Sequence, residues 1–67
     1  MQLIINGDTY TDLKAGMNVL ELLSHLSLPM AKVAVERNKE IVPKSGYASV
    51  VLQDGDVLEI ITFIGGG

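Results

Sequence analysis

The C-terminal run carries the residues whose types and spacing could do chemistry. Its sequence is Phe63-Ile64-Gly65-Gly66-Gly67, so apolar residues pass directly into three glycines. Glycine has no Cβ, and a run of it can thread a narrow channel where a larger residue would clash. Three extended residues reach about 10 Å beyond a folded body. We predict that Gly67 presents an accessible α-carboxylate as the reacting group; an inert, frayed terminus is the alternative.

A free carboxylate is a poor electrophile and reacts only after conversion to a mixed anhydride such as an acyl-adenylate. The sequence has no phosphate-binding glycine motif, so we expect no bound cofactor and a partner enzyme that uses ATP and Mg. Attack on the adenylate by a persulfide-derived sulfur would leave a C-terminal thiocarboxylate. A domain of this size can hardly enclose a catalytic pocket, and we predict a carrier acted on by enzymes.

No other residues form a convincing reactive or metal-binding set. His25 is the only histidine and the chain has no cysteine, which argues against a zinc site and a thiolate nucleophile. Asp54-Gly55-Asp56 lacks the further carboxylates of a calcium loop and is predicted to be a turn. Glu36 to Glu40 is predicted to be the solvated tip of a hairpin. We therefore expect no metal.

Length and composition indicate one small domain that folds. The chain has 67 residues, 48% of them hydrophobic and 19% charged, which is more apolar than a disordered segment. The net charge of −3 disfavours nucleic acid and anionic membranes as partners. Residues 45–67 hold three acids and no base. Without an evident leader or membrane-spanning run, a cytoplasmic location is expected.

The order of expected elements points to one helix on one sheet. Asn6-Gly7 predicts a hairpin turn between residues 3–5 and 9–13. Asn18 as N-cap with Glu21 begins a helix over 18–27. Strands are expected over 32–37, 41–42 and 57–64. This pattern predicts an α+β, ubiquitin-like β-grasp fold with a four- to five-stranded mixed sheet and one covering helix.

The last strand is predicted to lie beside the first and to lead into the tail. The β-grasp domain is expected to span residues 1–64, followed by a flexible tail of 65–67. If Leu58 and Ile60 face the helix, alternation places other residues on the open face. The predicted partner-binding residues are Ile4, Glu59, Ile61, Phe63, Ile64 and Gly65, with Asp54, Asp56 and Glu59 adding salt-sensitive attraction to a basic partner.

Several motifs together resemble a known family. They are Met1-Gln2-Leu3 with Asn6-Gly7, Val35-Glu36-Arg37-Asn38 before Ile41-Val42-Pro43, Asp54-Gly55-Asp56, and the terminal glycines. The chain resembles the ubiquitin-like sulfur carriers of the ThiS/MoaD family, most closely those of thiamin biosynthesis. The resemblance implies adenylation of Gly67 by an E1-like, ThiF-like enzyme, with Gly66 as the second essential glycine. It also implies sulfur supplied through a cysteine desulfurase and delivered to a ThiG-like thiazole synthase.

Three other functions stay open at the level of sequence. The small subunit of molybdopterin synthase shares the implied fold and glycine tail but has a different sulfur acceptor. A ubiquitin-like modifier would instead form isopeptide bonds to lysines. A plain binding module would use the folded domain and leave the tail inert.

Overall fold

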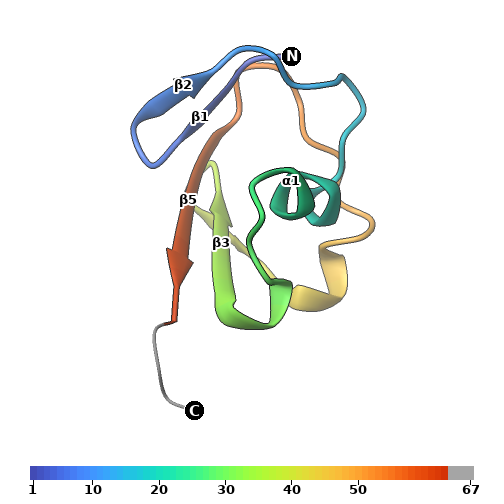
Figure 1. Ribbon diagram of the computed structural model, residues 1–67, viewed down its shortest axis with the longest axis vertical. Helices are drawn as coiled ribbons and strands as arrows, with labels where there is room; N and C mark the ends of the chain where they lie inside the picture. Colours follow the sequence, from blue (N-terminus) through green and yellow to red (C-terminus); the bar gives the residue numbers. More distant parts are fainter. Residues whose placement is uncertain (64–67) are drawn as a thin grey trace.

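The computed structural model describes residues 1–63 and shows a mixed sheet with one α-helix across one of its faces (Figure 1). The strands are β1 (Leu3–Ile5), β2 (Asp8–Tyr10), β3 (Val33–Arg37), β4 (Glu40–Val42) and β5 (Val57–Thr62), and the helix is α1 (Val19–His25). Short 3-10 turns η1 (Met30–Lys32) and η2 (Lys44–Gly46) precede β3 and follow β4. Among residues 1–63, no helix has the length and apolar character needed to cross a membrane.

The five-stranded sheet has the order β2-β1-β5-β3-β4, so the last strand is the central one. β5 runs parallel to β1 and antiparallel to β3, while β1–β2 and β3–β4 are antiparallel hairpins. This arrangement confirms the predicted β-grasp fold and the predicted placement of the last strand beside the first. The second strand ends at Tyr10, whereas the sequence predicted that it would reach residue 13. Leu13 instead leaves the sheet and is buried in the core.

Helix α1 begins at a complete capping box, as the sequence predicted. The Asn18 side chain accepts a hydrogen bond from the Glu21 N–H at 2.7 Å, and Glu21 Oε1 accepts one from the Asn18 N–H at 2.9 Å. These bonds satisfy main-chain donors that a helix N-terminus leaves unpaired. The helix ends at His25, two residues earlier than predicted, because Ser27 has a left-handed φ of 59° that no helix can continue.

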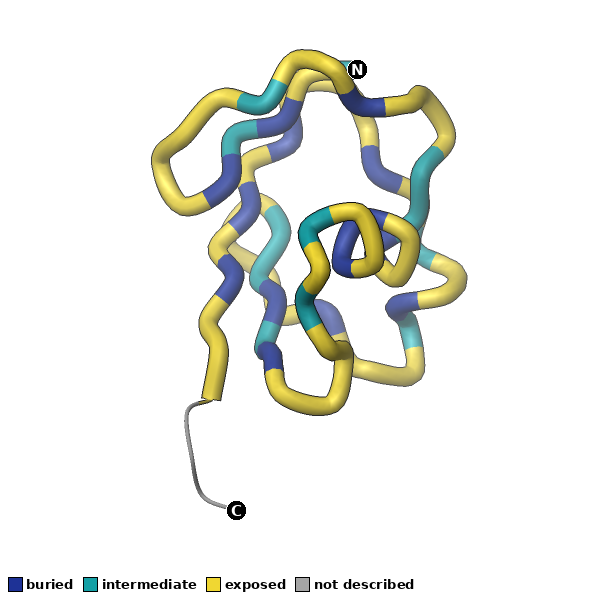
Figure 2. Tube along the Cα trace, in the orientation of Figure 1, coloured by how far each residue is buried: buried dark blue, intermediate teal, exposed yellow. Residues whose placement is uncertain are grey.

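The core lies between α1 and the covered face of the sheet. From Val57 to Ile61 of β5, exposed and buried residues alternate, as Figure 2 shows. Tyr47, which follows η2, is the largest fully buried side chain, and its hydroxyl donates a hydrogen bond to the Val33 carbonyl at 3.4 Å. The other core residues are Leu3, Ile5, Leu13, Val19, Leu22, Leu23, Val33, Val35, Val42, Leu52, Leu58 and Ile60.

Candidate functional site

Strand β5 is paired with β3 along its whole length, up to Phe63, and with β1 only near its start. On one side, Val33 of β3 lies opposite Thr62, and the Phe63 N–H donates to the Lys32 carbonyl at 2.8 Å. On the other side, Ile5 of β1 lies opposite Leu58. The predicted reactive residues Gly66 and Gly67, and the predicted partner contacts Ile64 and Gly65, lie outside the described residues.

Two asparagines in the hairpin turns add hydrogen bonds to the main chain of β5. The Asn6 side chain accepts from the Ile60 N–H at 2.8 Å and donates to the Ile60 carbonyl at 3.1 Å. The Asn38 side chain accepts from the Val57 N–H at 2.9 Å. Both asparagines have left-handed φ angles, 50° and 49°, which asparagine tolerates better than most residues. The two turns therefore close their own hairpins and also hold β5 in place between β1 and β3.

The open face of the sheet carries an exposed apolar group along β5. Leu58 and Ile60 are buried against the helix, whereas Ile61 and Phe63 are 61% and 56% exposed. Ile4, opposite Val57, is half-buried on the same open face. The predicted facing of the strand is therefore confirmed. The role of these residues in binding a partner stays a prediction.

The open face also holds residues that were not predicted to belong to it. Val57 and, on β4, Ile41 are exposed apolar residues of this face. The predicted hairpin tip is confirmed, because Arg37 pairs with Glu40 around the turn at Asn38 and Lys39. Glu36 lies within β3, in the strand expected over 32–37, directly opposite Glu59. Because Val33 and Val35 are buried, the alternation of β3 places Glu36 on the open face. Two carboxylates thus interrupt the apolar surface.

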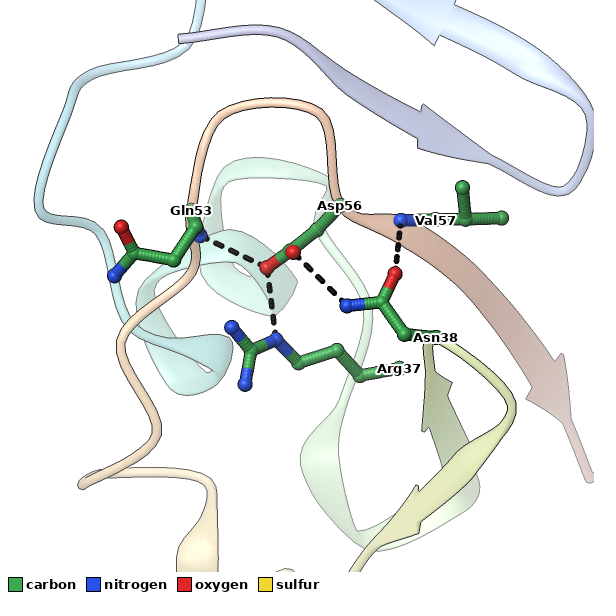
Figure 3. Close-up of polar contacts among 5 residues, drawn as sticks. All are labelled: Arg37, Asn38, Gln53, Asp56 and Val57. Atoms are coloured by element: carbon green, nitrogen blue, oxygen red, sulfur yellow. Dashed lines mark hydrogen bonds and ion pairs between the residues drawn. The ribbon is translucent and has the colours of Figure 1, made fainter.

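Asp56 has a structural role that excludes the predicted role in docking. Its carboxylate accepts hydrogen bonds from Arg37 Nε at 2.7 Å, the Gln53 N–H at 2.8 Å and Asn38 Nδ2 at 3.0 Å (Figure 3). The side chain is buried and ion-paired, so the predicted attraction of Asp56 to a basic partner is wrong. The motif Asp54-Gly55-Asp56 predicted a turn, and the left-handed φ of 87° at Gly55 confirms it. The motif did not predict that Asp56 pairs with the distant Arg37.

The surroundings of Asp56 favour its ionised form. Burial acts to raise the pKa of Asp56, but the hydrogen bonds from Gln53, Asn38 and Arg37, together with the Arg37 charge, outweigh burial and hold the pKa below its ordinary value. The carboxylate joins the β3–β4 turn to the loop that precedes β5. It therefore anchors the start of the strand whose other end leads to the predicted reactive terminus.

A helix-covered mixed sheet whose central, last strand leads directly into a glycine tail defines a ubiquitin-like β-grasp carrier domain. The family model described as "ThiS family" matches residues 2–67, and the chain belongs to that family. The crystal structure of the thiamine biosynthesis protein ThiS from Geobacter metallireducens superposes with a TM-score of 0.83 at 39% identity, covering 100% of both chains. These findings confirm the family and fold that the sequence predicted.

Two further relatives are a sulfur carrier protein and a thiazole synthase. The sulfur carrier protein ThiS of Bacillus subtilis is 43% identical over 63 residues, which are 94% of this chain and 96% of that protein. A thiazole synthase of Paramagnetospirillum magneticum is 57% identical over 67 residues, which are 100% of this chain. The chain spans only 20% of the length of that thiazole synthase. A segment similar to the whole of this chain therefore forms one fifth of a protein named thiazole synthase.

Proposed function

We propose that the chain is a sulfur carrier for thiazole formation in thiamin biosynthesis and acts as a protein co-substrate. The observation that carries the proposal is the membership of the ThiS family across residues 2–67, a match that includes the glycine tail. The position of β5 supports it, because a central strand gives the tail a rigid base. The Phe63 N–H bond to Lys32 is the last described link between that strand and the sheet.

The reaction begins when an E1-like, ThiF-like enzyme uses ATP and Mg to adenylate the Gly67 carboxylate, releasing pyrophosphate. A persulfide formed by a cysteine desulfurase attacks the acyl carbon, forming a C–S bond and expelling AMP. A thiol then reduces the resulting acyl disulfide, leaving the thiocarboxylate on Gly67 and a new disulfide on the donor. Gly66 and Gly65 have no side chains, so a partner can enclose the reacting carbon in a narrow channel.

The open face of the sheet is the proposed docking surface for these partners. Phe63 and Ile61 supply the exposed apolar contact, with Ile4 at its margin. Glu59 and Glu36 lie next to this contact and favour a partner with a basic side chain. Phe63 precedes Gly67 by four residues, so an enzyme that binds this face also directs the tail.

The experiment measures ATP–pyrophosphate exchange by the activating enzyme of the same organism. The full chain is expected to support exchange, and a variant lacking Gly66 and Gly67 is expected to fold and to support none. Equal exchange with both proteins would contradict the proposal. Accumulation of lysine-linked conjugates in place of thiocarboxylate would favour a protein modifier.

A further inference from the structure

The edge of β5 that faces β1 is only partly paired. In the pairing with β3, the Phe63 N–H bonds to Lys32, and Val33 lies opposite Thr62. The main-chain N–H and carbonyl groups of Glu59, Ile61 and Phe63 therefore point towards β3. Those of Ile60 and Thr62 point to the opposite edge of the strand, which faces β1. β1 ends at Ile5, so its pairing with β5 stops near Leu58.

Asn6 adds the last hydrogen bonds on this edge of β5, and the pairing stops at Ile60. The Asn6 N–H donates to the Leu58 carbonyl at 2.9 Å, and the Asn6 amide group pairs with both main-chain groups of Ile60. The next main-chain groups on that edge belong to Thr62, about 6.6–6.8 Å further along the strand. Within residues 1–63, no hydrogen bond is found to the N–H or carbonyl of Thr62 on this edge. Figure 1 shows β5 continuing past the β1–β2 hairpin.

A hollow lies beside this unpaired edge, on the helix side of the sheet. Its volume is about 280 Å³, and its walls include Tyr10, Leu26 and Leu28, with Ile60 and Thr62 along β5. A cavity of roughly 150 Å³ can accommodate a benzene ring, so the hollow has room for a large apolar side chain. No charged residue or proline interrupts Ile60 to Phe63, although such residues commonly protect exposed strand edges.

We propose that an extended segment of the thiazole synthase adds to β5 at Thr62, continuing the line of β1, and places one apolar side chain in this hollow. The unpaired N–H and carbonyl suit an extended main chain, which is the mode of strand addition. The thiazole synthase is the occupant because a segment similar to this chain forms 20% of the Paramagnetospirillum magneticum protein that is named thiazole synthase. Thr62 precedes Gly67 by five residues, a reach of at most about 18 Å. Strand addition there would bring the acceptor enzyme to the tail, and the inference rests on the proposed function.

The test measures amide hydrogen exchange of the full chain by NMR, alone and with the thiazole synthase of the same organism added as a separate protein. The Thr62 amide is expected to exchange at least about tenfold more slowly in the complex, since strand pairing buries it, and the Leu26 and Leu28 methyl resonances are expected to shift. Unchanged Thr62 exchange in a formed complex, or no complex at all, would overturn the proposal. Protection that grows with the concentration of the free protein would assign the edge to a second copy and would also overturn it.

Two variants of Thr62 distinguish the contribution of its main-chain N–H to binding from that of its side chain. Thr62→Pro removes the N–H on the unpaired edge, and Thr62→Val keeps it. Thr62→Pro is expected to bind the thiazole synthase about fivefold to tenfold more weakly than Thr62→Val, which corresponds to one hydrogen bond. Equal affinities would contradict strand addition. Formation of the thiocarboxylate by the activating enzyme is measured on the same samples: its absence means that the proposed function has failed, and its presence with equal affinities means that only the docking mode has failed.

Discussion

Glu36 and Glu59 lie directly opposite each other on β3 and β5, in the middle of the open face. No ion pair joins either of them to another residue of the described chain. Like charges at directly opposed positions of an antiparallel pair destabilise the sheet. The pair therefore does not stabilise the free domain, which is consistent with the proposed docking surface.

Removing one charge of this pair is expected to increase the stability of the domain and to weaken partner binding. Glu59→Gln should raise the free energy of unfolding by up to about 1 kcal/mol, because the repulsion is removed. The same change should weaken binding to the activating enzyme and reduce its salt dependence. Urea titration and binding at two salt concentrations measure both effects, and Asp12→Asn is the charge-matched control. Tighter binding by Glu59→Gln would show that the partner brings no basic group to this face.

Phe63→Ala tests the apolar part of the same face. Because the side chain is 56% exposed, its loss should reduce the free energy of unfolding by less than about 1 kcal/mol. Binding to the activating enzyme should weaken about tenfold, as expected of an aromatic contact at the centre of an interface.

Ile60→Ala is the matched control for Phe63→Ala, because Ile60 lies on the same strand but faces the core. It should cost about 2–4 kcal/mol of unfolding free energy through the cavity it creates. Binding to the activating enzyme, measured on the folded fraction, should change little. The opposite result, in which Phe63→Ala unfolds the domain and keeps wild-type affinity, would place the docking surface elsewhere.

Asp56→Asn is expected to destabilise the domain by about 2–4 kcal/mol, since it removes the ion pair and leaves Arg37 without a partner. The folded state lowers the pKa of Asp56 below its ordinary value of 3.8. The stabilisation is therefore complete above that value and is lost as the pH falls below it. Urea denaturation at pH 7 and pH 3 should show a smaller difference between the two pH values for the variant than for the wild type. Equal pH dependence would mean that the Arg37–Asp56 pair does not stabilise the fold.

The fold could be predicted from local patterns because its elements depend on short-range signals. Asn6-Gly7 marks the first turn, the Asn18–Glu21 capping box marks the helix start, and alternation along β5 gives the two faces. These signals act over a few residues and are visible in one sequence. The facing of Phe63 followed from the same alternation.

The roles of Asp56 and of the β5 edge could not be predicted in this way, because they depend on contacts between distant residues. Asp56 meets Arg37 across 19 positions, and Asn6 meets Ile60 across 54. Which carboxylate is buried and which main-chain groups stay unpaired depends on the register between strands. That register is set only when the whole sheet forms.

Whether Gly67 carries sulfur is tested by alkylation followed by intact-mass measurement. The chain is incubated with the activating enzyme, ATP, Mg and a cysteine desulfurase, and is then treated with iodoacetamide. Replacement of oxygen by sulfur adds about 16 Da, nearly the same mass as oxidation of a methionine, so mass alone is ambiguous. The chain has no cysteine, and alkylation therefore distinguishes the two products. We expect one carbamidomethyl group on the C-terminal peptide, present only when ATP and the desulfurase are both supplied. A chain that gains no alkylated product under these conditions, while the activating enzyme consumes ATP with a control carrier, would contradict this expectation.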